Sequence, residues 1–258
     1  MRRGSRKRHV QLSLDQARRP DGQHGGWRPG AGRPAKPGAV SHATRANQPG
    51  RFPQHVTLRI QEGVPSLARE GLMKIIRGVV RGSHKDASGG RLDAQRLAAD
   101  ARDLASAGGF RIVEFNVLGN HLHLLVEAAN KDVLARGVQG FCVSAARRLN
   151  SALMRKGKLF AHRYHARALK TPREARNVLA YVLLNRKHHD AEKRYGRFWI
   201  DPCSSAAWSG AWAERVRTDD VWKRELVAQP WPTAPPATWL LATGWKRHGL
   251  LRFDERPG

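Results

Sequence analysis

Cysteine is scarce in this sequence, because the 258 residues include only Cys142 and Cys203, 61 positions apart. Two distant cysteines cannot provide a disulfide framework or the cysteine pairs of a zinc finger. No run approaches the roughly 18 consecutive apolar residues of a membrane span, and no apolar block follows the basic N-terminus as in a signal peptide. We therefore expect a cytoplasmic protein with no membrane partner, in which histidine, carboxylate or amide groups hold any metal ion.

Acidic residues are also few. The chain has 21 Asp and Glu against 47 Lys and Arg, and its formal net charge is +26. So large an excess is unusual for a metabolic enzyme and indicates a polyanionic partner. Residues 1–50 contain 11 basic and 2 acidic residues and residues 51–200 contain 28 and 12, whereas residues 201–258 contain 8 and 7. The surface for the polyanion is therefore expected in the first two segments.

The same three segments differ in composition, and we expect them to be separate parts of the protein. Residues 1–50, rich in Gly and Pro, predict a flexible basic arm in which Arg33, within half of an AT-hook, is a candidate nonspecific DNA contact. A plain linker is the alternative. Residues 51–200 are expected to form the main folded domain. Residues 201–258 form a Trp-rich extension whose rings are expected to pack on the core more than to stack on bases.

Apolar periodicity in residues 51–200 predicts alternating strands and helices. Gly119-Asn120 predicts a two-residue hairpin turn, and Thr171-Pro172-Arg173-Glu174 has the spacing of a helix capping box. The expected strands are 55–60, 110–118, 121–127 and 160–169, and the expected helices are 66–82, 92–107, 132–156 with Asp132 as cap, and 172–187. This order predicts an α+β fold, a ferredoxin-like (RRM-like) antiparallel sheet with helices on one face.

His121 and His123 form the first candidate site. Side chains alternate between the two faces of a strand, so these histidines share one face while Leu122 and Leu124 occupy the other. At about 3.3 to 3.4 Å per residue the two imidazoles lie about 6.6 to 6.8 Å apart and can share one metal ion. The spacing alone fits equally a pair of histidines on a solvated sheet face.

Tyr181 and Asn185 form the second candidate site, one turn apart at the edge of the apolar face of the helix that follows the capping box. A phenol and a carboxamide placed there can face one pocket, as a nucleophile and a third metal ligand. The alternative is a half-buried tyrosine whose hydroxyl meets water. The only other tyrosines are Tyr164 and Tyr195, in the expected fourth strand and beyond the helix, so Tyr181 is the preferred nucleophile.

In their order and spacing these residues resemble the HUH single-tyrosine transposases of the insertion-sequence-200-like family, and within it the REP-associated tyrosine transposases. The resemblance covers roughly residues 51–195 and rests on His121-Leu122-His123, Phe160-Ala161-His162-Arg163-Tyr164-His165 and Tyr181-Val182-Leu183-Leu184-Asn185. It implies a metal-dependent enzyme that cleaves and rejoins single-stranded DNA beside hairpins. In that reaction Tyr181 forms a 5′-phosphotyrosine, while His121, His123 and Asn185 hold Mg²⁺ or Mn²⁺.

The chemistry of the residue types agrees with these roles. A phenol, with an ordinary pKa near 10, is a weak nucleophile at neutral pH, so charge on the phosphate must be neutralised by a cation. Three neutral ligands leave the charge of the ion intact for that purpose. The histidines alone would suit zinc as well, and the preference for Mg²⁺ or Mn²⁺ comes from the family resemblance.

Basic residues are densest between positions 147 and 176, where Glu174 is the single acidic residue. A run of one sign favours phosphate contacts and predicts binding that weakens steeply with salt. The candidate DNA-binding residues are Arg147, Arg148, Arg155, Lys156, Lys158, Arg163, Arg167, Lys170, Arg173 and Arg176.

Two other functions remain open from the sequence. Ferredoxin-like sheets also serve as binding platforms, so a noncatalytic domesticated protein that binds DNA or RNA hairpins fits the same charge. A metal phosphodiesterase that releases a free 5′-phosphate, with Tyr181 only packing, fits the histidine pair. A nucleoid-associated location is expected for the enzyme and for the binding protein, as a monomer or a homodimer.

Overall fold

The structure is a computed structural model in which residues 49–85, 91, 109–189 and 195–257 are described. These residues belong to one structural unit. The helix expected at 92–107 lies outside the described residues. Of the arm expected at 1–50, only residues 49 and 50 are described, so Arg33 also lies outside.

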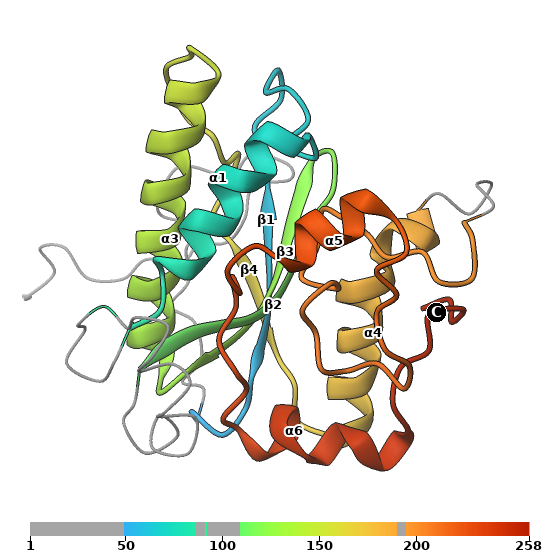
Figure 1. Cartoon of the computed structure of the whole chain (residues 1–258). Helices are drawn as coiled ribbons and strands as arrows, with labels where there is room; N and C mark the ends of the chain where they lie inside the picture. Colours follow the sequence, from blue (N-terminus) through green and yellow to red (C-terminus); the bar gives the residue numbers. More distant parts are fainter. Residues whose placement is uncertain (1–48, 86–90, 92–108, 190–194, 258) are drawn as a thin grey trace, which may run out of the picture. The chain divides into compact units, whose positions relative to one another are not determined.

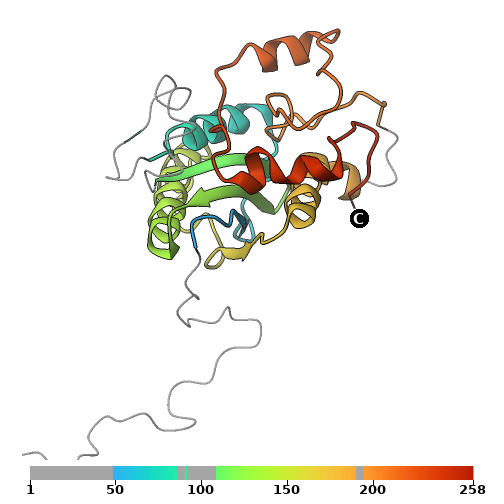
Figure 2. The ribbon, with the colours of Figure 1, turned by 90° about the horizontal axis from the view of Figure 1, so that it is seen from below.

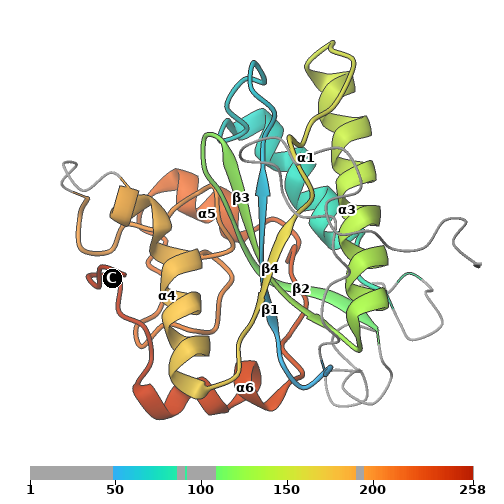
Figure 3. The ribbon, with the colours of Figure 1, turned by 180° about the vertical axis from the view of Figure 1, so that it is seen from behind.

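A four-stranded sheet forms the centre of this unit (Figure 1). The strands pair antiparallel in the order β2-β3-β1-β4, and Figure 3 shows β4 beside β1 at one edge. This order and the helices between the strands confirm the predicted α+β, ferredoxin-like fold. Along the chain the elements are β1 (Gln54–Arg59), α1 (Glu70–Arg81), β2 (Phe110–Val117), β3 (His121–Ala128), α3 (Lys131–Ala152), β4 (His165–Ala168) and α4 (Pro172–His189).

Local sequence signals account for two of the junctions. The hairpin between β2 and β3 turns at Gly119-Asn120, and the Leu118 amide donates to the His121 carbonyl at 2.9 Å. At the start of α4 the Glu174 amide donates to Thr171 Oγ1 at 3.2 Å, while the Thr171 amide donates to Glu174 Oε2 at 3.1 Å. These reciprocal bonds are the predicted capping box, and they set where α4 begins.

Several boundaries differ from the prediction, since α1 begins at Glu70 and not at 66, and α3 ends at Ala152 and not at 156. The cap of α3 is Asn130 and not Asp132, because the Asn130 side chain accepts from the amides of Asp132 and Val133 and so satisfies two of the free donors of the first turn. The fourth strand is shorter than expected. Only His165–Ala168 pairs continuously with β1, and Phe160 forms an isolated bridge to Ile60.

Helices α1 and α3 cover one face of the sheet, as predicted. Alternate apolar residues of β1 and β3, such as Val56 and Leu124, are buried on this face. Met73 of α1 and Phe141 of α3 pack against these strand residues in the same apolar core. The alternation that predicted the strands therefore identifies the residues that α1 and α3 cover.

The opposite face carries a second apolar core that the sequence did not predict. Leu125 of the sheet packs there with α4 and with the Trp-rich extension. The extension contains α5 (Val221–Val227), α6 (Trp239–Ala242) and the 3-10 helix η2 (Gly244–His248), and Figure 2 shows α6 and η2 in red beside the gold α4. Three of its tryptophan rings are buried, those of Trp208, Trp212 and Trp245. The other three are exposed, those of Trp222, Trp231 and Trp239.

The extension is also tied to the sheet by polar contacts. The Glu127 carboxylate pairs with Arg111 at 3.6 Å and accepts from the amides of Ala237 and Thr238 at 2.9 and 2.7 Å. Residues 203–205 hydrogen-bond the backbone of β2 along its free edge, which protects that edge. None of the helices in the described part of the chain combines the length and apolar character needed to cross a bilayer.

Candidate active site

The histidine pair lies on the face of the sheet that α4 partly covers. His121 and His123 of β3 are directly opposite Arg59 and Thr57 of β1, and directly paired residues of antiparallel strands share a face. The ring centroids of the two histidines are 6.3 Å apart, with an interplanar angle of 15°. Both imidazoles therefore project side by side, at nearly the spacing expected from two alternate positions of one strand.

A hydrogen bond to Asn120 favours one tautomer of His121. Its Nδ1 lies 2.7 Å from the side-chain oxygen of Asn120, which can only accept. Nδ1 therefore carries the proton, and Nε2 holds the lone pair through which a neutral histidine binds a metal ion.

A third histidine, which the sequence did not single out, reaches the same place from β1. His55 Nε2 lies 3.2 Å from His123 Nδ1, and Thr57 Oγ1 lies 3.3 Å from the same nitrogen. Burial, followed by the positive neighbours His165 and Arg167, lowers the pKa of His55 to about 4. The sequence did contain a signal for this residue, because His55 and Thr57 alternate with the apolar Val56 and Leu58. Only the register of β1 against β3 places His55 and Thr57 at the site.

Tyr181 contacts this histidine cluster from α4. Its ring meets His123 edge to face, with centroids 5.3 Å apart at 85°, and meets His55 at 5.8 Å and 69°. The tyrosine is half-buried. The structure thus brings the proposed nucleophile against the histidine pair, although the two segments are about sixty residues apart in the sequence.

Asn185 lies one turn after Tyr181 and is completely buried. Among the described residues, neither its amide nitrogen nor its side-chain oxygen has a hydrogen-bond partner. A buried, unsatisfied carboxamide costs free energy, and coordination of an ion through the oxygen would recover part of that cost. This chemistry fits the third ligand expected at the position.

No three His, Cys, Asp or Glu side chains within residues 49–85, 91, 109–189 and 195–257 are arranged to hold a metal ion. An ion at the histidine pair would therefore need a ligand of another kind, such as an amide oxygen or a DNA phosphate. The carboxamide of Asn185 supplies a ligand of that kind.

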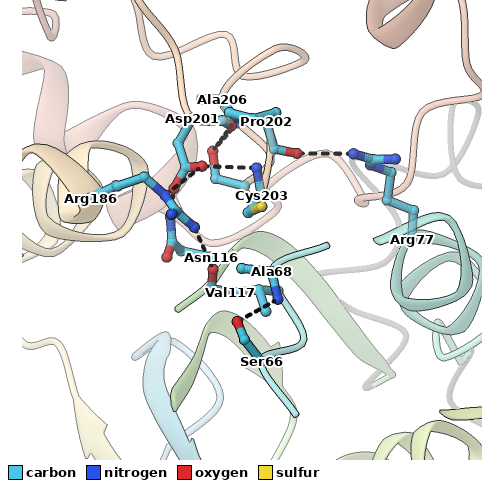
Figure 4. A network of polar contacts seen from close by, with 11 residues as sticks. Ser66, Ala68, Arg77, Asn116, Val117, Arg186, Asp201, Pro202, Cys203 and Ala206 are labelled. Atoms are coloured by element: carbon cyan, nitrogen blue, oxygen red, sulfur yellow. Dashed lines mark hydrogen bonds and ion pairs between the residues drawn. The ribbon is translucent and has the colours of Figure 1, made fainter. Parts of the chain in front are cut away.

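An ion pair with the buried Asp201 carboxylate holds the end of α4 (Figure 4). Arg186 Nε donates to Asp201 Oδ1 at 3.1 Å, and Asp201 also accepts from the side chain of Asn116 and the amide of Cys203, each at 2.9 Å. Arg186 reaches the Val117 carbonyl as well. The network therefore joins α4 to the end of β2, from which the hairpin leads to His121.

The other two tyrosines lie away from these ring contacts. Tyr164 packs against the core beneath α1 and α3, and Tyr195 stacks on Trp199 with centroids 4.0 Å apart. Tyr181 is thus the tyrosine that the structure places in ring contact with His123.

The candidate DNA-binding residues fall into two groups. In the first, Arg155 bonds Asn150, Arg167 pairs with Glu174 at 2.9 Å, and Arg176 pairs with Glu255 at 2.7 Å. The others are exposed, on the outer face of α3 and on the segments around β4, and they are Arg147, Arg148, Lys156, Lys158, Arg163, Lys170 and Arg173.

Comparison with known proteins finds a matching family model and several similar solved structures. Residues 79–200 match the family model described as transposase, IS200-like. The chain is similar to a REP-associated tyrosine transposase bound to a REP hairpin, at 16% identity over 70% of this chain and 96% of the other, with a TM-score of 0.45. It is also similar to a Deinococcus radiodurans R1 protein provisionally named a transposase, at 19% identity over 51% and 85%, with a TM-score of 0.24. No curated protein sequence matches the chain.

The matched segment contains both halves of the site. It includes the histidine pair of β3 together with Tyr181 and Asn185 of α4. The resemblance drawn from the sequence is therefore confirmed by residues 79–200, which match the IS200-like transposase family.

Proposed function

We propose that this protein cleaves and rejoins single-stranded DNA next to hairpins, with Tyr181 as the nucleophile. The observation that carries the proposal is the edge-to-face contact of Tyr181 with His123, which joins α4 to the histidine pair in one site. The match of residues 79–200 to a transposase family model makes DNA strand cleavage and transfer the expected reaction class.

The proposed reaction is a transesterification at phosphorus. The Tyr181 phenol loses its proton to solvent, its oxygen bonds the phosphorus, and the bond from phosphorus to the 3′ oxygen breaks. The leaving 3′ oxygen takes up a proton, so the products are a 5′-phosphotyrosine and a free 3′-hydroxyl. Since one phosphodiester replaces another, the reverse attack by a 3′-hydroxyl rejoins DNA without nucleotide hydrolysis.

His121, His123 and Asn185 are the proposed ligands of a divalent ion, Mg²⁺ or Mn²⁺. Such an ion would withdraw negative charge from the scissile phosphate. The hydrogen bond from His121 Nδ1 to Asn120 and the unsatisfied carboxamide of Asn185 support this assignment.

The proposed DNA surface combines the sheet face with the basic residues around it. Arg59 lies on the same face as His121, and Arg167 lies directly opposite His55 on β4, so positive charge flanks the histidines. A phosphate backbone that crosses this face would reach Tyr181. The exposed basic residues of α3 and the segments around β4 are proposed as further contacts, whereas a contact from Arg33 concerns the part of the chain that is not described.

The test is incubation of the protein with labelled hairpin DNA that carries a single-stranded flank, in Mg²⁺ or Mn²⁺, followed by denaturing electrophoresis. We expect a labelled band at the mass of the protein that disappears in Tyr181→Phe, while hairpin affinity changes little. Tyr164→Phe and Tyr195→Phe are matched controls and should retain the band, because these are the only other tyrosines.

The same experiment separates the alternatives. An adduct that persists in Tyr181→Phe would overturn the assignment of the nucleophile. Tight binding with no adduct in either metal would favour the noncatalytic hairpin-binding protein. Cleavage with no adduct would favour the metal phosphodiesterase.

A further inference from the structure

His55 contacts His123 although it belongs to neither motif of the site. It lies on β1 directly opposite Leu125. Thr57, two residues later on the same face of β1, is directly opposite His123. The His55 and His123 centroids are 5.3 Å apart, with His55 Nε2 3.2 Å from His123 Nδ1. This is hydrogen-bond distance, so one of the two nitrogens carries the proton and the other accepts it.

The direction of this bond decides which nitrogen of His123 can bind a metal ion. If His123 Nδ1 carries the proton, the lone pair is on Nε2. If His55 Nε2 carries it and His123 is neutral, the His123 lone pair on Nδ1 accepts the bond and Nε2 is protonated. The Thr57 hydroxyl, 3.3 Å from the same Nδ1, can donate or accept and so does not decide between the two.

We propose that His55 is a positioning residue that accepts the Nδ1 proton of His123 and thereby presents the Nε2 lone pair of His123 to the metal ion. The inference rests on the proposed function, in which His123 is a ligand. Ligating histidines generally donate their second ring N–H to a fixed acceptor, which sets both the tautomer and the ring orientation.

The arrangement around His121 supports this direction. Asn120 accepts the Nδ1 proton of His121 at 2.7 Å, so His121 has its lone pair on Nε2. With His55 as the acceptor for His123, both histidines of the pair have the same tautomer, each with its own hydrogen-bond partner. The two rings lie side by side, 6.3 Å apart and nearly parallel at 15°.

His55 also borders the nucleophile, since its ring lies 5.8 Å from that of Tyr181. Removal of the side chain would therefore change packing as well as the hydrogen bond. His55→Gln separates the two effects, because Gln Oε1 follows as many bonds from Cβ as His Nε2 and can only accept. His55→Leu is the matched variant that keeps apolar bulk but has no acceptor.

The experiment uses the full chain and two measurements that do not depend on DNA cleavage. Long-range ¹⁵N–¹H spectra of the histidine rings report tautomers in the metal-free protein, with the His123 signals identified by their loss in His123→Ala. Calorimetric titration with Mn²⁺ alone reports affinity. We expect His123 to be protonated at Nδ1 in the unaltered chain and in His55→Gln. We expect Mn²⁺ affinity to fall roughly 10- to 100-fold in His55→Leu and to recover in His55→Gln.

The inference is overturned if His123 of the unaltered chain is protonated at Nε2, or if His55→Leu binds Mn²⁺ as tightly as the unaltered chain. Loss of affinity in both variants without rescue by Gln would also overturn it. The variant His123→Ala distinguishes failure of this inference from failure of the proposed function. If His123→Ala binds Mn²⁺ normally, His123 is not a ligand and the metal site itself is wrong.

Discussion

Glu114 is a carboxyl group of β2 that is buried beneath the C-terminal extension. The hydroxyls of Ser205 and Ser209 donate to its two oxygens. Burial raises the pKa of Glu114 to about 7, since these hydrogen bonds to the carboxylate offset its desolvation only in part. The group therefore changes its charge near neutral pH at the junction of the sheet and the extension.

This raised pKa predicts a loss of stability with rising pH. The carboxyl titrates near its ordinary 4.5 when unfolded and near 7 when folded, so the folded state binds more protons between those values. The free energy of unfolding should fall on the order of 3 kcal/mol from pH 4.5 to 7 and then level off. Denaturant unfolding of the unaltered chain and of Glu114→Gln over this range measures the effect as the difference between the two curves.

The difference between the curves is needed because two histidines act in the opposite direction. Burial lowers the pKa of His55 and of His84 to about 4, so their contribution to stability is lost as pH falls from 6.5 towards 4. Both histidines are present in the unaltered chain and in Glu114→Gln, and their contribution cancels. Parallel curves for the two proteins would contradict the assignment to Glu114.

Asp201 provides a second prediction for a single residue. Its side chain is fully buried, that of Arg186 is 25% exposed, and loss of the carboxylate leaves a largely buried charge without its partner. We expect Asp201→Ala to lower the free energy of unfolding by about 3 kcal/mol or more. Urea unfolding measures the loss, and the adduct assay should weaken because α4 carries Tyr181.

Asp219→Ala is the matched control for Asp201. Asp219 pairs with Arg217 at 3.4 Å, but both side chains are more than half exposed. Solvent screening limits such a pair to about 0–1 kcal/mol. Equal losses in the two variants would show that the network of Figure 4 does not anchor α4.

At the scale of elements, the approach of α3 to the sheet depends on one glycine. A Cβ at Gly137 would lie 2.2 Å from Cγ of Phe110, a fully buried ring of β2. Gly140, less than one turn later in the same helix, would place its Cβ with nothing within 4 Å. The two glycines thus have different roles, although both lower helix propensity.

The pair Gly137→Ala and Gly140→Ala tests this role. Gly137→Ala forces α3 away from β2 and should cost about 1–3 kcal/mol or more through overpacking. Gly140→Ala should raise stability by about 0.5–1 kcal/mol, because alanine favours the helix and meets no obstacle. Thermal and urea unfolding give both values, and a stabilised Gly137→Ala would refute the close contact.

Prediction of the elements was accurate where the signal was local. The alternation in β1, the Gly119-Asn120 turn and the Thr171–Glu174 capping box each depend on neighbouring residues, and each predicted its element correctly. The start of β4 was less accurate, because strand length depends on which residues find a partner across the sheet. The second layer over the sheet was not predicted, since it requires contacts between α4 and residues far along the chain.

At the scale of the whole molecule, the excess of basic residues predicts DNA affinity that is sensitive to salt. Arg147 and Arg148 are exposed on α3 in an open groove of about 1040 Å³ that Arg136 also lines. If both contact phosphates, the double variant to Gln should reduce the slope of log affinity against log salt by about 2. Fluorescence titration of a labelled hairpin at several salt concentrations measures the slope.

Arg252→Gln is the control for this measurement. Arg252 is exposed but lies in the nearly neutral extension and pairs with Asp254 at 3.1 Å. Its replacement should leave the salt slope unchanged. A slope that falls equally in this control would mean that general charge, and not a surface on α3, governs binding.

The sequence by itself determined the order of strands and helices, the positive charge of the first 200 residues, and the shared face of His121 and His123. These properties follow from local periodicity and composition, which folding does not change. It also placed Tyr181 and Asn185 one turn apart, because helix geometry sets that separation.

Only the tertiary structure decided which distant residues meet. The register of β1 against β3 brings His55 to His123, and the packing of α4 brings Tyr181 to both. The pairing of Arg186 with Asp201 likewise joins α4 to the segment that follows it. Periodicity states which face a side chain occupies, but contacts between elements depend on how complementary surfaces pack, and that is a property of the whole fold.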